Sequence, residues 1–313
     1  MSSTDQKCKN SGIRITKHLR LIGWLFLVAF PGVLVVDVLM GFAYRTSTEA
    51  NVIITPPRSG RTHRAIIVFP GFIMPGAPLA KAFAPYVSDD DALVVVNYAE
   101  RGVDVPQICD KIMVALHTLQ PSELRIYGGS MGGMLGKLFL DRYRQAGTPY
   151  GKVAFILDTA PSSRNNVKRP TVLLNVSCWY RGGPLSSAMW AAVIEIQAKP
   201  PAEADASRDT VRAARHAGAW FGMPAATSQA CFVAKFPPLR AGELLDVAQQ
   251  VIYLEGTPPG EDPLIRIPDA IAGWRVAFPN LKVITVQCRS KRWHLPLVEY
   301  PRATLRAVIS PGS

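Results

Sequence analysis

The sequence predicts an α/β protein with a mostly parallel, doubly wound sheet, an inserted helical cap and one transmembrane helix ahead of them. Three observations support this prediction. Six short apolar runs alternate with helical stretches along the chain. A Gly-x-Ser-x-Gly motif joins one of these runs to the helix that follows it. An apolar segment, residues 21–44, lies near the N-terminus and contains 19 apolar side chains.

The composition is that of a globular protein with one apolar segment attached. Of the 313 residues, 48% are apolar and 19% are charged, which excludes a disordered chain, a collagen and a disulfide scaffold. The net charge is +12, of which residues 1–44 carry +3 and the remainder +9. The basic clusters lack interleaved aromatic residues and any nucleic-acid motif, so we expect no nucleic-acid partner. No feature indicates a metal, an organic cofactor or an oligomeric state.

The apolar segment is predicted to be a membrane anchor. Its length suits a helix across a hydrocarbon core of about 30 Å. Residues 1–20 form a basic leader, and only Arg45 follows the segment closely, so the positive-inside rule keeps the leader in the cytoplasm and exports the rest. Membrane lipid would then contact residues 21–44 of a single-pass protein. A cleaved signal peptide, giving a secreted protein, and a buried helix remain alternatives, because Gly41-Phe42-Ala43 resembles a cleavage site and Asp37 is costly inside a span.

The elements of the remaining chain follow in order. Residues 45–63 are polar and rich in proline, and are predicted to be a tether before the main domain, residues 64–313. Runs rich in β-branched residues are typical of strands covered by helices on both faces, and strands that alternate with helices indicate a parallel sheet. Residues 161–245 interrupt the alternation and are predicted to form the cap. The predicted strands are 65–69, 92–97, 124–127, 153–157, 251–254 and 281–286, with helices at 105–119 and 131–145.

Four cysteines follow the apolar segment, namely Cys109, Cys178, Cys231 and Cys288. They allow three sets of two pairings, and sequence alone does not choose among them. A bridge between Cys178 and Cys231 is favoured in an oxidising compartment, because both lie in the cap region. Buried free thiols are the alternative.

Ser130 is the candidate nucleophile. The motif Gly128-x-Ser130-x-Gly132 directly follows a predicted strand and directly precedes an apolar helix. A serine on such a sharp turn is exposed at a helix N-terminus, which stabilises developing negative charge, and the flanking glycines let neighbouring backbone pass close by. The motif in this context predicts nucleophilic catalysis rather than an incidental glycine turn.

A serine hydroxyl requires a base, and the base requires an acid that orients it. Of the five histidines, only His294 comes shortly after a predicted strand, whereas the others, His18, His63, His117 and His216, do not. The acid should lie between Ser130 and His294 in the chain. Asp262, which follows the strand 251–254, is the favoured candidate. The alternatives are Glu261, Glu255 and Asp158.

With these residues the chain resembles the α/β-hydrolase superfamily over most of residues 64–310, the cap excluded. The resemblance is carried by the elbow around Ser130, by Phe69-Pro-Gly-Phe72, by Asp262-Pro-Leu-Ile265 and by His294-x4-Glu299-x-Pro301. Pro70 stands where the family commonly has histidine, and Trp293 where it often has glycine. These two departures are compatible with the same catalytic class, but they do not indicate which subfamily the chain resembles.

The resemblance implies that Ser130 attacks an acyl carbonyl, that His294 accepts its proton and that Asp262 holds the imidazole. It also implies that the backbone N–H groups of Phe72 and Met131 form the oxyanion hole. The sequence thus predicts a membrane-anchored serine hydrolase of esterase or lipase type, acting on a small-molecule or lipid ester through an acyl-enzyme. An acyltransferase with the same triad is an alternative, because the elbow is similar to that of homoserine acetyltransferases. A non-catalytic binding protein with this fold is the other.

Overall fold

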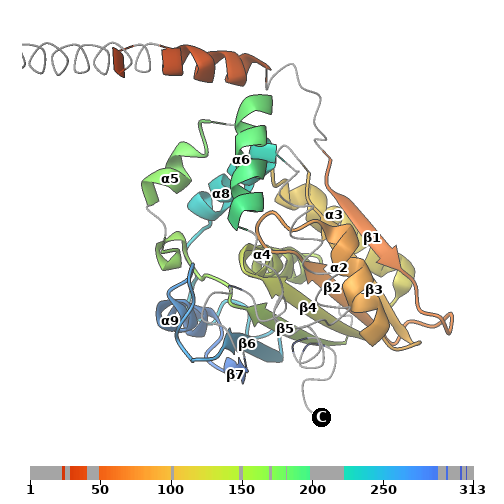
Figure 1. Ribbon diagram of the computed structural model, residues 1–313. Coiled ribbons are helices and arrows are strands. Elements are labelled where there is room, and N and C mark those ends of the chain that lie inside the picture. The colour runs from red at the N-terminus through yellow and green to blue at the C-terminus, as the bar shows by residue number, and fades with distance from the viewer. Residues whose placement is uncertain are drawn as a thin grey trace, which may run out of the picture.

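The computed structural model describes residues 23–24, 29–40, 49–99, 102–147, 151–168, 171–180, 182–197, 222–287, 294, 304 and 308 (Figure 1). These residues form a seven-stranded sheet with the order β1-β3-β2-β4-β5-β6-β7. All neighbouring strands are parallel except β1 and β3. The predicted mostly parallel sheet is therefore confirmed. The strands are β1 (Asn51–Thr55), β2 (Arg64–Phe69), β3 (Asp91–Asn97), β4 (Glu123–Gly129), β5 (Lys152–Asp158), β6 (Gln250–Gly256) and β7 (Lys282–Val286).

Helices cover both faces of the sheet, as doubly wound folds require. On β2, Ile66 and Val68 pack against one face together with α2, and Ile67 and Phe69 pack against the other with α3, α4 and α9. This alternation follows from the period of two in a strand. Both faces are fully buried, which is why the strand reads as a continuous apolar run. The helices are α2 (Gly76–Phe83), α3 (Val105–Leu119), α4 (Met131–Gln145) and α9 (Ile267–Ala277), with 3₁₀ turns η1 (Ala84–Tyr86) and η2 (Arg164–Asn166).

The edge strand β1 was not predicted. Residues 51–55 fall in the segment predicted to be the tether, but they pair antiparallel with β3, from Asn51 opposite Asn97 to Thr55 opposite Leu93. An edge strand is only half buried, so it lacks the continuous apolar run of the central strands. The prolines that suggested a tether, Pro56 and Pro57, come directly after the strand has ended.

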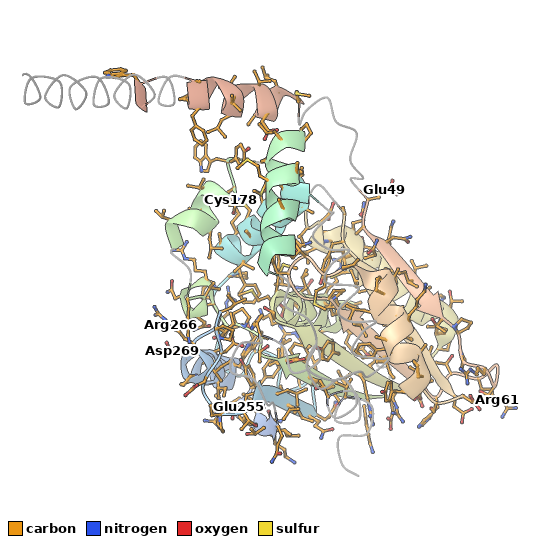
Figure 2. The ribbon with its side chains drawn as sticks, in the orientation of Figure 1. Glu49, Arg61, Cys178, Glu255, Arg266 and Asp269 are labelled. Atoms are coloured by element: carbon orange, nitrogen blue, oxygen red, sulfur yellow. A yellow bond between two sulfur atoms is a disulfide. The ribbon has the colours of Figure 1, made fainter. Side chains whose placement is uncertain are left out.

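Three helices, α5 (Thr171–Val176), α6 (Pro184–Gln197) and α8 (Gly222–Lys235), form a group outside the sheet (Figure 1). They fall in the segment predicted to be the cap, of which residues 198–221 lie outside the described part of the chain. A disulfide joins Cys178, just after α5, to Cys231 on α8, so the predicted pairing is confirmed (Figure 2). Cys109 is a buried free thiol, and Cys288 lies outside the described residues.

We expect the disulfide to contribute strongly to stability. It closes a loop with a sequence separation of 53, and constraining the unfolded chain over such a loop is worth about 4 kcal/mol. The double variant Cys178→Ser/Cys231→Ser should therefore unfold at a lower urea concentration than the parent protein. Dithiothreitol should lower the midpoint of the parent to that of the variant and leave the variant unchanged. A parent midpoint insensitive to reduction would contradict the prediction.

The predicted transmembrane helix over residues 21–44 is wrong. Among the residues that the structure describes, no helix is both long enough and apolar enough to cross a bilayer. The single-pass, exported location inferred from that helix is wrong with it, whereas the lipid contact of residues 21–44 stays a prediction. The leader 1–20 lies outside the described residues, as do residues 21–22, 25–28 and 41–44 of the segment.

Asp37 supplies the physical reason for this correction. Residues 29–40 are helical and lie across the N-terminal end of α6 (Figure 1). The Asp37 side chain is buried and accepts hydrogen bonds from Tyr180 Oη (2.8 Å), Leu185 N (2.8 Å), and Ser186 N and Oγ (3.3 and 2.6 Å). A carboxylate at the first turn of a helix satisfies backbone N–H groups and opposes the positive end of the helix dipole. The carboxylate of Asp37, which would be unfavourable in a membrane span, is thus stabilised by hydrogen-bond donors of the protein.

We expect Asp37→Ala to release the first turn of α6. Burial pushes the pKa of Asp37 up, but hydrogen bonds from Ser186, Tyr180 and Leu185 outweigh it and hold the pKa below its usual value. A depressed carboxyl pKa stabilises the folded state above the unfolded pKa, near 4, and that stability is lost as the pH falls through the lower folded pKa. At neutral pH the variant should lose about 1–3 kcal/mol of local stability.

Amide hydrogen exchange of Leu185 and Ser186 measures this release. Their exchange should accelerate in Asp37→Ala at neutral pH. The control is Asp89→Asn, which alters an exposed carboxylate on the loop before β3 and should leave both amides unchanged. Equal protection in the parent and in Asp37→Ala would refute the assigned role.

Candidate active site

Ser130 occupies a sharp turn between β4 and α4. β4 ends at Gly129 and α4 begins at Met131, and Ser130 has φ +49° and ψ −118°. A non-glycine residue with positive φ is strained and persists only when its surroundings fix it. Here the Ser130 N–H donates to the carbonyl oxygen of Asp158 on β5 (2.8 Å), and its carbonyl accepts from Gly133 (2.9 Å). The turn is therefore fixed by the neighbouring strand and by the first turn of the helix.

The two glycines of the motif are required by close approach of backbone. A Cβ atom on Gly132 would lie 2.1 Å from the carbonyl oxygen of Phe69 and 2.7 Å from that of Pro70. A Cβ on Gly128 would lie 2.5 Å from the Cα of Gly133. Neither contact can be relieved by a side-chain rotation, because the atoms that the added Cβ would meet belong to the backbone in both cases. The elbow is thus packed directly against the loop that follows β2.

The structure brings Ser130, His294 and Asp262 together. His294 Nε2 lies 2.6 Å from Ser130 Oγ, and His294 Nδ1 lies 2.9 Å from Asp262 Oδ2. Ser130 is 7% exposed and Asp262 is 5% exposed. The three residues span more than half the chain and meet because β4 and β6 end at the same edge of the parallel sheet. This is the hydrogen-bonded order that nucleophilic catalysis by serine requires.

The three alternative acids have other partners. Glu255, at the end of β6 (Figure 2), accepts hydrogen bonds from Gly260 N (3.0 Å) and Thr285 Oγ1 (3.2 Å). Asp158 is fully buried and accepts from Tyr127 Oη (2.6 Å). Glu261 is exposed. Of the four candidates that the sequence left open, Asp262 is the one whose carboxylate contacts His294.

The loop that carries Asp262 is held on two sides. Asp262 Oδ1 accepts from the N–H groups of Leu264 and Ile265, both at 2.7 Å, so the second carboxylate oxygen is oriented by its own loop. Lys168 Nζ donates to the backbone carbonyl of Asp262 (2.5 Å), and Lys168 N donates to the carbonyl of Leu264 (2.7 Å). The sequence did not predict this role of Lys168, and no motif there signals it.

Two buried tyrosines lie beside the strand ends. Tyr253 Oη donates to the carbonyl of Ala160 (3.2 Å), and Tyr127 Oη donates to Asp158. Burial raises the pKa of both phenols well above the usual value, and the nearby Asp158 carboxylate adds to the effect in each case. Both tyrosines therefore remain neutral hydrogen-bond donors at physiological pH and support the strand ends structurally.

The two predicted oxyanion donors belong to segments that touch. Met131 is the first residue of α4, where backbone N–H groups lack partners within the helix. Phe72 lies in a turn from Gly71 to Met74, closed by a hydrogen bond from Met74 N to the Gly71 carbonyl (3.2 Å). We call residues 70–74 the oxyanion loop. Tyr98 Oη anchors it by donating to the Pro70 carbonyl (2.8 Å). In the described residues, no cluster of three or more His, Cys, Asp or Glu side chains could hold a metal ion.

Comparison of the structure with solved structures decides the fold. It is similar to a thermophilic esterase from Thermogutta terrifontis (TM-score 0.56, 15% identity, 84% of this chain and 96% of that chain). It is also similar to the carboxylesterase CesB from Bacillus subtilis (0.54, 12%, 86% and 92%) and to MenH from S. aureus (0.53, 14%, 84% and 97%). The chain has the α/β-hydrolase fold.

The α/β-hydrolase fold confirms the resemblance inferred from the residues around Ser130. At the level of sequence, no protein-family model and no curated protein matches the chain. Ser130 lies on a strand-to-helix turn of the type called a nucleophile elbow, with its φ of +49°. Function is a separate question, because this fold carries many activities.

Proposed function

We propose that this α/β-hydrolase cleaves carboxylic esters with Ser130 as nucleophile, His294 as general base and Asp262 as the acid that orients it. The observation that carries the proposal is the continuous hydrogen-bonded path from Ser130 Oγ through the imidazole to Asp262, with distances of 2.6 and 2.9 Å. Esterases among the structures with the same fold support it. The substrate class is small-molecule esters.

The reaction proceeds in two halves. Ser130 Oγ forms a bond to the ester carbonyl carbon while its proton passes to His294 Nε2. The carbonyl oxygen becomes an oxyanion, which accepts hydrogen bonds from the backbone N–H groups of Phe72 and Met131. The imidazolium then protonates the departing alkoxide, and the ester C–O bond breaks to leave an acyl-enzyme. In the second half water attacks the acyl carbon while His294 takes its proton. The bond between the acyl carbon and Ser130 Oγ then breaks, the imidazolium returns its proton to Ser130 Oγ, and the carboxylic acid leaves.

Active-site labelling together with ester turnover tests the proposal. The full chain should be labelled by a fluorophosphonate probe at Ser130, identified by peptide mass spectrometry, and should hydrolyse p-nitrophenyl esters from acetate to laurate. A folded sample that is neither labelled nor active would favour the non-catalytic alternative. Products formed only when an alcohol or amine acceptor is added would favour the acyltransferase, and hydrolysis alone in every mixture would argue against it.

A further inference from the structure

The cap helix α8 contacts the oxyanion loop through one buried side chain. Gln229 lies on α8 and is 4% exposed. Its Oε1 accepts a hydrogen bond from the backbone N–H of Ile73 at 2.6 Å, across a sequence separation of 156 residues. Neither the elbow motif nor the resemblance singles out Gln229. This contact joins the segment predicted to be the cap directly to the segment that carries a proposed oxyanion donor.

Ile73 is a residue that needs such a contact. It is the third residue of the turn from Gly71 to Met74, and its φ is +50°. Turns with a positive φ at this place favour glycine or asparagine, and a β-branched side chain is strongly disfavoured there. Isoleucine therefore stays in this conformation only because its surroundings determine it. The hydrogen bond to Gln229 and the burial of the Ile73 side chain are the surroundings that the structure shows.

The conformation of Ile73 sets the direction of the adjoining peptide groups. Phe72 immediately precedes Ile73 and is the other central residue of the same turn. A rotation about the backbone of Ile73 would therefore shift the whole turn, and with it the N–H of Phe72. The other end of the loop cannot compensate, because Tyr98 holds Pro70 and the backbone of Phe69 and Pro70 abuts Gly132.

Helix α8 is itself well fixed at this point. Cys231, two residues beyond Gln229, forms the disulfide to Cys178. The Gln229 side chain is thus carried by a helix whose position is restrained by a covalent link to the end of α5. A restrained acceptor can hold the strained turn at Ile73 in place. If Gln229 were mobile, it could move with the turn as the turn relaxed.

We propose that Gln229 is a positioning residue for the oxyanion hole, through which α8 holds Ile73 in its left-handed conformation and thereby orients the N–H of Phe72. The proposal rests on the proposed esterase function and adds a residue to it. Gln229 acts through Ile73 and Phe72 rather than by touching the reacting atoms.

The variant Gln229→Met tests this by removing the acceptor while keeping the length of the side chain. Misplacement of a catalytic group by about 1 Å can cost on the order of 100-fold in rate, so we expect kcat to fall by about 30-fold. We expect KM to change by less than about threefold, since the oxyanion contact strengthens in the transition state. Affinity for a trifluoromethyl ketone, whose adduct with Ser130 carries an oxyanion, should fall in parallel with kcat/KM.

Thr227→Val is the matched control. Thr227 is also a buried polar residue of α8, but among the residues that the structure describes its hydroxyl donates to carbonyls of the same helix, those of Met223 and Pro224. Its replacement removes a buried polar contact of α8 and leaves the hydrogen bond between Gln229 and Ile73 in place. Thr227→Val should therefore keep kcat and ketone affinity within about threefold of the parent. Equal losses of kcat and ketone affinity in the two variants would indicate that Gln229 only stabilises the helix, and would overturn the proposal.

Ile73→Gly provides the rescue. Glycine adopts positive φ without strain, so the turn should need Gln229 less. In the Ile73→Gly background we expect Gln229→Met to lower kcat by less than about fivefold, against about 30-fold in the parent. An undiminished loss in that background would overturn the proposal. If the parent itself shows no Ser130-dependent turnover, the proposed function has failed. If the parent is active and Gln229→Met matches it in kcat and ketone affinity, the proposal about Gln229 alone has failed.

Discussion

Ser130→Ala is expected to lower kcat for p-nitrophenyl ester hydrolysis by about 10⁴-fold or more, because the substitution removes the atom that forms the acyl-enzyme. The residual rate would come from the oxyanion donors and substrate binding alone. The fold should survive, since alanine has no greater difficulty than serine at φ +49° and the backbone bonds of residue 130 to Asp158 and Gly133 remain. Steady-state kinetics measure the effect, and a thermal unfolding scan verifies that the variant is folded.

Ser122→Ala is a control matched in chemistry. Ser122 precedes β4 whereas Ser130 follows it, so the two serines lie at opposite ends of one strand. Ser122 Oγ also contacts a histidine, His63 Nδ1, at 2.9 Å. Because that serine–histidine pair lies at the amino end of the sheet, away from the elbow, we expect full activity in Ser122→Ala. Unchanged turnover in Ser130→Ala, or a comparable loss in both variants, would contradict the assignment of Ser130.

Asp262→Asn has the second-largest expected effect, a fall in kcat of about 10⁴-fold at neutral pH. The carboxylate accepts a hydrogen bond from the protonated His294 Nδ1 and so leaves Nε2 unprotonated toward Ser130. An asparagine can keep its oxygen toward the N–H groups of Leu264 and Ile265 and then presents its NH₂ group to Nδ1. The imidazole would then carry its proton on Nε2, the tautomer that cannot accept the proton of the serine. The loop should remain folded because the Oδ1 contacts survive.

Glu255→Gln serves as the control for Asp262→Asn. Glu255 is a second buried acid and lies at the end of β6, with partners at Gly260 and Thr285 rather than at His294. Its neutralisation changes the local charge to the same extent. We expect kcat within about fivefold of the parent, because the Glu255 carboxylate is bound by Gly260 and Thr285 and leaves the contact between Asp262 and His294 in place. A fall in Glu255→Gln as large as in Asp262→Asn would show that charge, and not the orientation of His294, is responsible.

The central elements were predictable because their sequence signals are local. The helices α3 and α4 begin and end where the apolar spacing predicted, at residues 105–119 and 131–145. For α3 the boundary is chemical as well, since Asp104 accepts from Gln107 N at the N-cap and Gln120 adopts the left-handed conformation at the end. The edge strand β1 escaped prediction because it is buried on fewer sides, and its signal is correspondingly weaker.

The transmembrane helix predicted over residues 21–44 was wrong for a different reason, because here the local signal was strong and the contacts that matter are remote in sequence. A hydropathy count averages over the segment and treats Asp37 as a cost to be tolerated. In the folded chain Asp37 is bound by Tyr180, Leu185 and Ser186, which lie more than 140 residues away. The apolar content of the segment therefore did not predict its tertiary contacts.

The sequence by itself determined the strand and helix pattern, the elbow around Ser130 and the chain order of serine, acid and histidine. Those features depend on residues a few places apart, where periodicity and turn chemistry act. Only the tertiary structure decided which of four acids contacts His294, that Cys178 meets Cys231, and that Gln229 reaches Ile73. These are distances between residues remote in sequence, and they depend on how the sheet gathers its carboxyl ends and how α8 packs above them.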